Sequence, residues 1–145
     1  MHLCTYPFES TNEHRDYVFI SEGPKGAIKK VIYFTEMGCN LYNLGFGDWD
    51  EAARSMDDKV RSNNNDRDKV LTTVARVVMS FLEYYPQVTV FAKGSSPART
   101  RLYQMGIFAN WQEISILLTV KGFIDGIWLP FEKCRNYDSF MVHIR

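Results

Sequence analysis

The sequence predicts a single α/β (α+β) domain over residues 1–145, built as a mixed, twisted sheet with two main helices. Three observations predict it. The segment 17–48 holds three runs rich in β-branched and aromatic residues, which favour strands. Apolar residues then recur every three or four positions over 70–82, which indicates a helix. A short strand pattern follows, and a helix between two strands favours a crossover with part of the sheet parallel.

The first two strands are expected at 17–22, "YVFISE", and 28–36, "IKKVIYFTE". The intervening "GPKG" has strong turn chemistry, so the pair is predicted to form a hairpin. A third strand is expected at 40–48, "NLYNLGFGD", where Gly45 and Gly47 suggest a bulge or a close backbone approach. The polar segment 49–68 is predicted to be a loop with a short helical turn at 50–56.

The first helix carries one apolar stripe, formed by Val70, Val74, Val77 and Phe81. Asp66 or Asn65 is expected to cap its start, because an Asx side chain accepts a hydrogen bond from an orphan backbone N–H.

The second helix is expected to begin at Pro97, with Ser95 or Ser96 as its cap. The remaining strands are expected at 87–94, 113–124 and 126–130, followed by a helical turn and a last strand within 131–144.

Bulk composition limits the classes of partner. Lys plus Arg number 17 and Asp plus Glu number 17, so no overall field favours nucleic acid or an acidic membrane. No apolar stretch approaches the roughly 18 residues of a membrane span, and the N-terminus does not resemble a signal peptide. The cysteines, Cys4, Cys39 and Cys134, are far apart, which favours reduced thiols and a cytoplasmic location. The three histidines are also scattered, so no metal set is expected.

The segment "KGSSPARTRLYQMGIF", residues 93–108, is the first candidate site. Free N–H groups at the start of the second helix favour an anion, and the helix dipole adds to them. Arg99 and Arg101 lie at this positive end, where a cation is unfavourable unless an anion joins it. The sequence therefore predicts that these arginines, with Ser95 and Ser96, bind a small anionic ligand. The alternative is that both arginines are solvated or paired with nearby carboxylates.

Tyr103 follows Arg99 by four residues and so lies on the same helical face. It is the candidate catalytic acid or hydrogen-bond donor beside the anion. The alternative is a buried tyrosine with a satisfied hydroxyl.

A second loop that runs into a helix start contains Asn63, Asn64 and Asn65. Asparagine tolerates left-handed backbone, so the three residues are candidates for an anion-holding nest. The alternative is structural capping, with Asp66 and Asp68 as first-turn acids that suit the helix dipole.

The chain resembles a family of small uncharacterised bacterial proteins, a domain of unknown function. The resemblance covers almost the whole chain in order and is carried by "ISEGPKGAIKKVIYF", "YNLGFGD", "SNNNDRDKVLTTVARVV", "GSSPARTRLYQMGI" and "LPFEKCRNYDSFMV". It implies no known activity.

The succession of strand, loop, helix, strand and "SPARTRLYQMGIF" also resembles the central part of the GCN5-related N-acetyltransferase fold. That family implies a phosphate-cradling loop R/Q-x-x-G-x-G/A, and Arg61, Asn64 and Asp66 stand at its positions here without either small residue. It implies N-x-x-A-x-x-L-Y in the later helix, where Leu102 and Tyr103 match. The resemblance implies acetyl-CoA as cofactor and Tyr103 as the group that protonates the departing thiolate.

Two functions stay open, and the sequence does not decide whether the protein is an enzyme. The first is a small anion- or cofactor-binding domain, a divergent acyltransferase-like enzyme with its site between the two helix starts. It rests on two strand-to-helix loops that converge where open α/β sheets bind ligands. The second is a non-catalytic interaction protein that binds a protein partner, such as a toxin–antitoxin or phage-defence component.

Overall fold

The computed structural model describes residues 4–58 and 63–145, and it confirms the expected α/β (α+β) class with a mixed sheet. Three helices occur in the described ranges, one more than the two main helices that the sequence predicts. The helices are α1 (Arg67–Tyr84), α2 (Pro97–Ala109) and α3 (Trp111–Leu117). The strands are β1 (Phe8–Thr11), β2 (Asp16–Gly23), β3 (Gly26–Gly38), β4 (Leu41–Asp50), β5 (Ser55–Asp57), β6 (Thr89–Ala92), β7 (Leu118–Ile124), β8 (Ile127–Pro130) and β9 (Ser139–Ile144).

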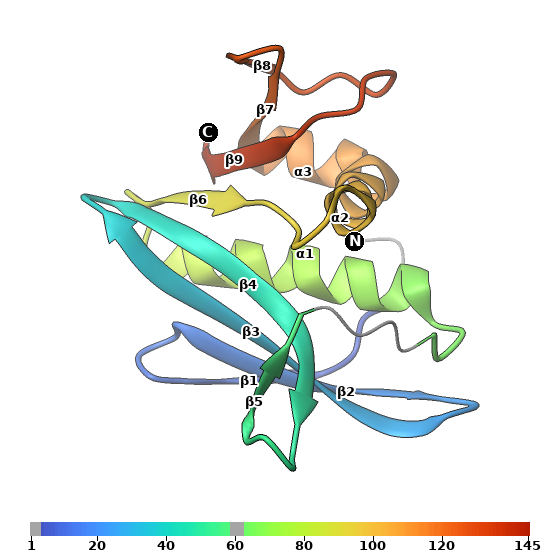
Figure 1. Ribbon diagram of the computed structural model, residues 1–145. Coiled ribbons are helices and arrows are strands. Elements are labelled where there is room, and N and C mark those ends of the chain that lie inside the picture. The colour runs from blue at the N-terminus through green and yellow to red at the C-terminus, as the bar shows by residue number, and fades with distance from the viewer. Residues whose placement is uncertain (1–3, 59–62) are drawn as a thin grey trace.

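All of these strands belong to one sheet of nine strands (Figure 1). Its order is β1-β2-β3-β4-β6-β9-β7-β8, and β5 pairs with β4 beside this path. β4 and β6 run parallel, while the other paired strands run antiparallel. Because α1 connects β4 to β6, the predicted helical crossover between parallel strands is confirmed.

The predicted hairpin is also confirmed. β2 pairs over its whole length with β3, from Asp16 with Tyr33 to Gly23 with Gly26, and Gly26 has a φ of 86°, which glycine adopts without strain. The sequence did not predict β1, which adds to the outer edge of β2 through pairs such as Phe8 with Phe19. β1 has four residues, three of them polar, so its own residues carry little strand signal.

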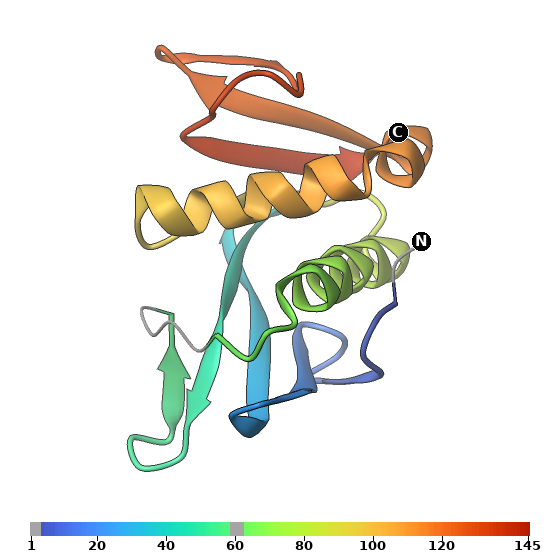
Figure 2. The same ribbon diagram turned by 90° about the vertical axis from the view of Figure 1, so that its right-hand side faces the viewer.

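Helix α1 packs its apolar stripe against one face of the sheet. Val77 and Phe81 are completely buried, and the Phe81 ring stacks on Phe34 of β3 with centroids 3.9 Å apart. α2 lies beside α1 on this face (Figure 2), where Gly106 of α2 lies close to Leu71 of α1. The two helices therefore cover the sheet together and bring their N-terminal ends to the same side of the molecule.

The parallel pairing of β4 and β6 is short. It runs from Leu41 with Thr89 to Leu44 with Ala92, where β6 ends and the chain turns into α2. β4 continues to Asp50 without β6 beside it, and its last residues, Asp48–Asp50, pair with β5 instead. The carboxyl-terminal part of β4 thus lies near the starts of α1 and α2.

The predicted helical turn at 50–56 is wrong. β4 extends to Asp50, and β5 folds back on it with Asp57 opposite Asp48. A Cβ at Gly47 would collide with the backbone of Asp57, which confirms a close backbone approach at this glycine. The strand forms because β4 supplies a pairing edge that the polar residues of β5 do not reveal by themselves.

The prediction of a strand over 113–124 is wrong in its first five residues and right in the rest. Residues 111–117 form α3, and β7 begins at Leu118. The Asn110 side chain between α2 and α3 is buried and donates to the Gly106 carbonyl at 2.9 Å, while Ile114 packs into the core. A continuous apolar run does not distinguish a strand from a short helix, so periodicity misassigned it. The expected last strand is confirmed as β9, which lies between β6 and β7.

Candidate functional site

A cleft of about 870 Å³ with charged, polar and apolar walls lies between the starts of α1 and α2 and the adjoining part of β3 and β4. Three groups of residues form its walls: the sheet residues Lys30, Phe46 and Asp48, the segment 63–71 with the first turn of α1, and Ala98, Arg99 and Leu102 of α2. The cleft thus joins two of the segments that the sequence singles out, the Asn63–Asn65 loop and the start of the second helix.

The N-terminus of α1 opens into this cleft without a side-chain cap among the described residues. Asp66 occupies the cap position, as predicted, but its side chain accepts no hydrogen bond from the helix backbone. Its Oδ2 instead accepts hydrogen bonds from the Tyr6 hydroxyl at 2.6 Å and the Ser21 hydroxyl at 2.5 Å. The predicted capping bond is therefore wrong, because the two hydroxyls bind the carboxylate and orient it away from the helix backbone. The first N–H groups of a helix have no partner within the helix, and Arg67 and Asp68, which carry two of them here, line the cleft.

The network around Asp66 was not foreseen. Tyr6 comes from the segment before β1 and Ser21 from β2, far from Asp66 in the sequence. The pKa of Tyr6 is raised by burial and by the hydrogen bond to Asp66, so its hydroxyl stays a donor at neutral pH. Lys69 lies over the Tyr6 ring at 4.2 Å. Only the fold brings these side chains together.

The three asparagines have different surroundings. Asn64 is buried, and its side chain accepts from the Lys25 N–H at 2.7 Å and donates to the Gly26 carbonyl at 2.9 Å. It therefore anchors the tip of the β2–β3 hairpin to the cleft wall. Asn63 and Asn65 are exposed, and Asn65 has a φ of 60°, the left-handed backbone that the sequence analysis considered. The predicted ligand-binding role of these asparagines stays a prediction.

The start of α2 follows the expected chemistry. Ser96 is the N-cap, with its hydroxyl accepting from the Arg99 N–H at 3.3 Å, and Pro97 is the first helical residue. The Ser95 hydroxyl donates to the Asp58 carbonyl at 2.9 Å. Both hydroxyls thus have partners within the protein, and neither serine lines the cleft. Their predicted contact with an anion stays a prediction.

The arginines of α2 lie in different places. Arg99 lines the cleft, whereas Arg101 is half-buried and does not. Arg61 lies outside the described residues. The cleft therefore brings Arg99 together with the asparagine loop and leaves Arg101 apart from it.

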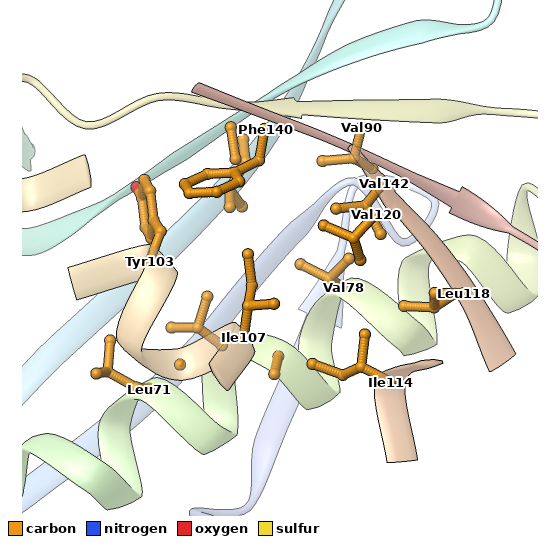
Figure 3. Close-up of a pocket in the computed structure, with 15 residues that line it drawn as sticks. Leu71, Val78, Val90, Tyr103, Ile107, Ile114, Leu118, Val120, Phe140 and Val142 are labelled. Atoms are coloured by element: carbon orange, nitrogen blue, oxygen red, sulfur yellow. The ribbon is translucent and has the colours of Figure 1, made fainter. Parts of the chain in front are cut away.

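Tyr103 lies in a separate, apolar cavity of about 60 Å³ between the helices and the sheet. Figure 3 shows its ring at one side of the cavity, near Phe140, with valine side chains of the sheet on the other side. Burial raises the pKa of Tyr103 to about 12, with Arg99 opposing and Asp58 adding to the rise. The hydroxyl is thus protonated at neutral pH and close enough to Arg99 to interact with it. Leu71 lines both the cavity and the cleft, so the two spaces adjoin.

The floor of the cleft holds an ion pair that the sequence analysis missed. Lys30 Nζ lies 2.5 Å from Asp48 Oδ1, and the exposed fractions of the two side chains are 8% and 14%. Asp48 is the last residue of the strand expected at 40–48, and β4 extends through it to Asp50. The sequence did contain a signal for a buried charge. Lys30 alternates in phase with Ile28, Ile32 and Phe34, so it lies on the core-facing side of its strand.

Neither a metal cluster nor a membrane segment appears in the described ranges. Over residues 4–58 and 63–145, no three His, Cys, Asp or Glu side chains gather closely enough to hold a metal ion. The helices of the same residues lack the combined length and apolar character that a membrane crossing requires.

Comparison with known proteins gives one match. The model of a family described as "Family of unknown function (DUF6934)" matches residues 2–145. Neither the curated proteins nor the solved structures contain a significant match to the chain.

Proposed function

Because the chain belongs to this family of unknown function over nearly its whole length, we propose its activity from the geometry of the cleft. The cleft binds a small anionic ligand, and the domain is a divergent acyltransferase-like enzyme that uses a coenzyme A thioester. The observation that carries the proposal is that the two long helices begin at one cleft, and that α1 does so without a side-chain cap.

The first step concerns the anion. A helix N-terminus presents backbone donors and a partial positive charge, which favour phosphate or carboxylate groups. Arg99 adds a full positive charge from α2 to the same cleft. The loop into α2 leaves the carboxyl end of β6, which runs parallel to β4, and a carboxyl end of this kind is the usual ligand position in open α/β sheets. The loop into α1 leaves β5, which folds back antiparallel on β4 beside the cleft residue Asp48. These features support an anionic head group at the cleft.

The second step concerns the reacting end of the ligand. The apolar cavity adjoins the cleft at Leu71 and contains Tyr103 beside Leu44 and Ala92, the last pair of the β4–β6 ladder. An elongated ligand with its head group in the cleft would bring its thioester to Tyr103 by passing Leu71, the residue that lines both spaces. The succession β4, α1, β6 and α2 is also the part that resembles the acetyltransferase fold. Both points support Tyr103 as the catalytic residue.

The third step is the chemistry. A coenzyme A thioester, when bound, would supply the acyl group that an acceptor amine takes up. Tyr103 would hold the proton that the departing sulfur requires, and its phenolate would recover a proton from the amine. The raised pKa keeps Tyr103 protonated before the step, and Arg99 stabilises the phenolate while it exists.

The test is direct binding of coenzyme A, acetyl-CoA and ATP, by calorimetry and by thermal shift. A ligand at a hundredfold excess over its Kd stabilises the folded protein by about 2.7 kcal/mol. Arg99→Glu is expected to weaken binding about tenfold or more, since it replaces an attractive charge by a repulsive one. Arg76→Glu, at an exposed position of α1 outside the cleft, is the matched control. Absence of any binding by the wild-type protein contradicts the proposal.

A second function, a non-catalytic interaction protein of the toxin–antitoxin or phage-defence kind, is supported by exposed apolar side chains at the carboxyl ends of α2 and α3. Phe108, Ile116 and Leu117 are each more than half exposed. Ile116→Lys with Leu117→Lys then abolishes co-purification of a protein partner that the wild-type chain retains. Equal recovery with both chains, or no stable partner with either, contradicts this second function.

A further inference from the structure

The Lys30–Asp48 pair forms the sheet side of the cleft. The two residues are directly opposite each other on β3 and β4, and the nitrogen–oxygen distance is 2.5 Å. In the same register, Asp48 lies between Lys30 and Asp57 of β5. Both members of the pair are mostly buried, so the strands on either side hold the charges in position.

The pair interrupts an apolar row. On the core-facing side of β3 and β4, the neighbouring opposite pairs are Ile32 with Phe46 and Phe34 with Leu44. The row is apolar where α1 packs on it, as the stacking of Phe34 on Phe81 shows. It becomes charged at Lys30 and Asp48, the point where the sheet faces the cleft. The charged residues of this row therefore lie where the sheet borders the cleft.

Stability alone does not account for this pair. Burial of two charges removes them from water, and their mutual attraction repays this only in part. Well-packed apolar residues of similar volume often give equal or higher stability at such positions. Three neighbours of the pair, Phe19, Ile32 and Phe46, are apolar, so an apolar replacement has suitable surroundings.

We propose that Lys30 binds the anionic group of the cleft's ligand from the sheet side, and that Asp48 is a positioning residue that keeps the Lys30 ammonium group in place. The inference rests on the proposed function of the cleft and adds the residue that meets the ligand opposite the helix starts. The ammonium group is a compact point charge on a flexible stem, so it accommodates a phosphate without breaking its contact with Asp48. The ligand class is a phosphate-bearing molecule held between the sheet and the two helices.

The experiment compares the wild-type chain with the double variant Lys30→Met, Asp48→Leu, which removes both charges and keeps the side-chain volumes similar. Coenzyme A and inorganic pyrophosphate are the probes, titrated by calorimetry, and Tm is measured on the same samples. We expect a Tm equal to or above that of the wild type, and affinity for both probes lower by about tenfold or more.

The outcomes separate the two proposals. Wild-type binding with unchanged affinity in the double variant overturns the role of Lys30 and leaves the proposed function intact. Absence of binding by the wild type overturns both. A folded double variant with a clearly lower Tm and unchanged affinity shows that the pair is structural.

A second variant covers the case in which the double variant does not fold. Lys30→Arg keeps the positive charge and its partner Asp48. It replaces the compact ammonium group by a wider, planar guanidinium group, whose charge lies at a different position. We expect it to fold and to bind coenzyme A several-fold more weakly, with a changed salt dependence. Affinity equal to that of the wild type overturns the inference.

Discussion

The two ends of α1 meet the same sheet in different ways. At the carboxyl end, Phe81 is enclosed by the rings of Phe34, Tyr42 and Tyr85, with centroids at 3.9, 5.5 and 5.1 Å. At the amino end, the helix faces a cleft with charged residues on its floor and hydroxyl groups around Asp66. One end of the helix packs into the aromatic core, and the other borders the cleft at which we propose that a ligand binds. Substitutions at the two ends are expected to separate these roles.

The largest effect is expected at the aromatic end. Phe81→Ala removes a completely buried ring and should lower the free energy of unfolding by about 3–5 kcal/mol, because a cavity replaces its contacts. Urea denaturation measures the change, and Tyr84→Ala, at a half-exposed ring one turn away, is the control. Similar losses of unfolding free energy in the two variants would contradict a special role of the buried Phe81 ring.

The next effect concerns the charged floor. Lys30→Met alone leaves the mostly buried Asp48 carboxylate without the Lys30 ammonium group, and should lower the free energy of unfolding by about 3 kcal/mol. The second substitution, Asp48→Leu, should restore most of this loss, since it removes the uncompensated charge. A double-mutant cycle in urea measures the coupling. Additive losses from the two substitutions would show that the pair does not act as a unit.

A smaller effect is expected at the hydroxyl network. Tyr6→Phe removes the hydrogen bond to Asp66 and should cost about 1–2 kcal/mol of unfolding free energy. It also removes one of the two hydroxyls that hold the Asp66 carboxylate away from the helix backbone, which favours capping of α1 and so a negative charge among the backbone donors. Coenzyme A should therefore bind more weakly to this variant, whereas Tyr84→Phe should change neither stability nor binding. Tighter binding to Tyr6→Phe would contradict the anion site at α1.

The smallest effect at neutral pH is expected for Tyr103→Phe, which keeps the ring in its apolar cavity. The difference should appear at high pH. The pKa of Tyr103 is raised from 10.0 to about 12 in the folded protein, so its contribution to stability is present below pH 10 and is lost as the pH rises toward 12. The variant should lose less stability than the wild type over this interval, as measured by urea denaturation at several pH values. Parallel losses would show that Tyr103 does not titrate as its burial implies.

The same substitution tests catalysis. If Tyr103 donates the proton to the departing thiolate, Tyr103→Phe should slow acyl transfer while binding of coenzyme A is retained. An equal rate in both proteins would remove Tyr103 from the mechanism without affecting the anion site.

Several parts of the fold were predictable because short stretches of sequence carry their signals. The turn residues between Gly23 and Gly26 specify a hairpin, the stripe ending at Phe81 specifies a helix, and Ser96 with Pro97 marks a helix start. The parallel pairing of β4 and β6 followed from the helix between them. By contrast, β1, β5 and α3 were missed because their neighbours in space, rather than their own residues, select their conformation.

The candidate site was predictable in its location and less so in its contents. The convergence of two strand-to-helix loops indicated a site beside Arg99 and the asparagine loop, and both line the cleft. Tyr103 was placed correctly on α2, but the cavity that raises its pKa depends on residues from four strands. The hydrogen bonds that orient the Asp66 carboxylate away from its helix come from Tyr6 and Ser21, and no local sequence pattern connects these residues to Asp66.

By itself, the sequence determined the class of fold, the hairpin, the two long helices and the order in which they join the strands, because turn chemistry, helix capping and apolar periodicity act over a few residues. Only the tertiary structure decided how each side chain is used. The Asp66 carboxylate accepts hydrogen bonds from two hydroxyls that are distant in sequence instead of capping its helix. Lys30 pairs with Asp48 of the neighbouring strand at the floor of the cleft. Burial and pairing between residues far apart in the chain set these arrangements, and a linear pattern does not encode those distances.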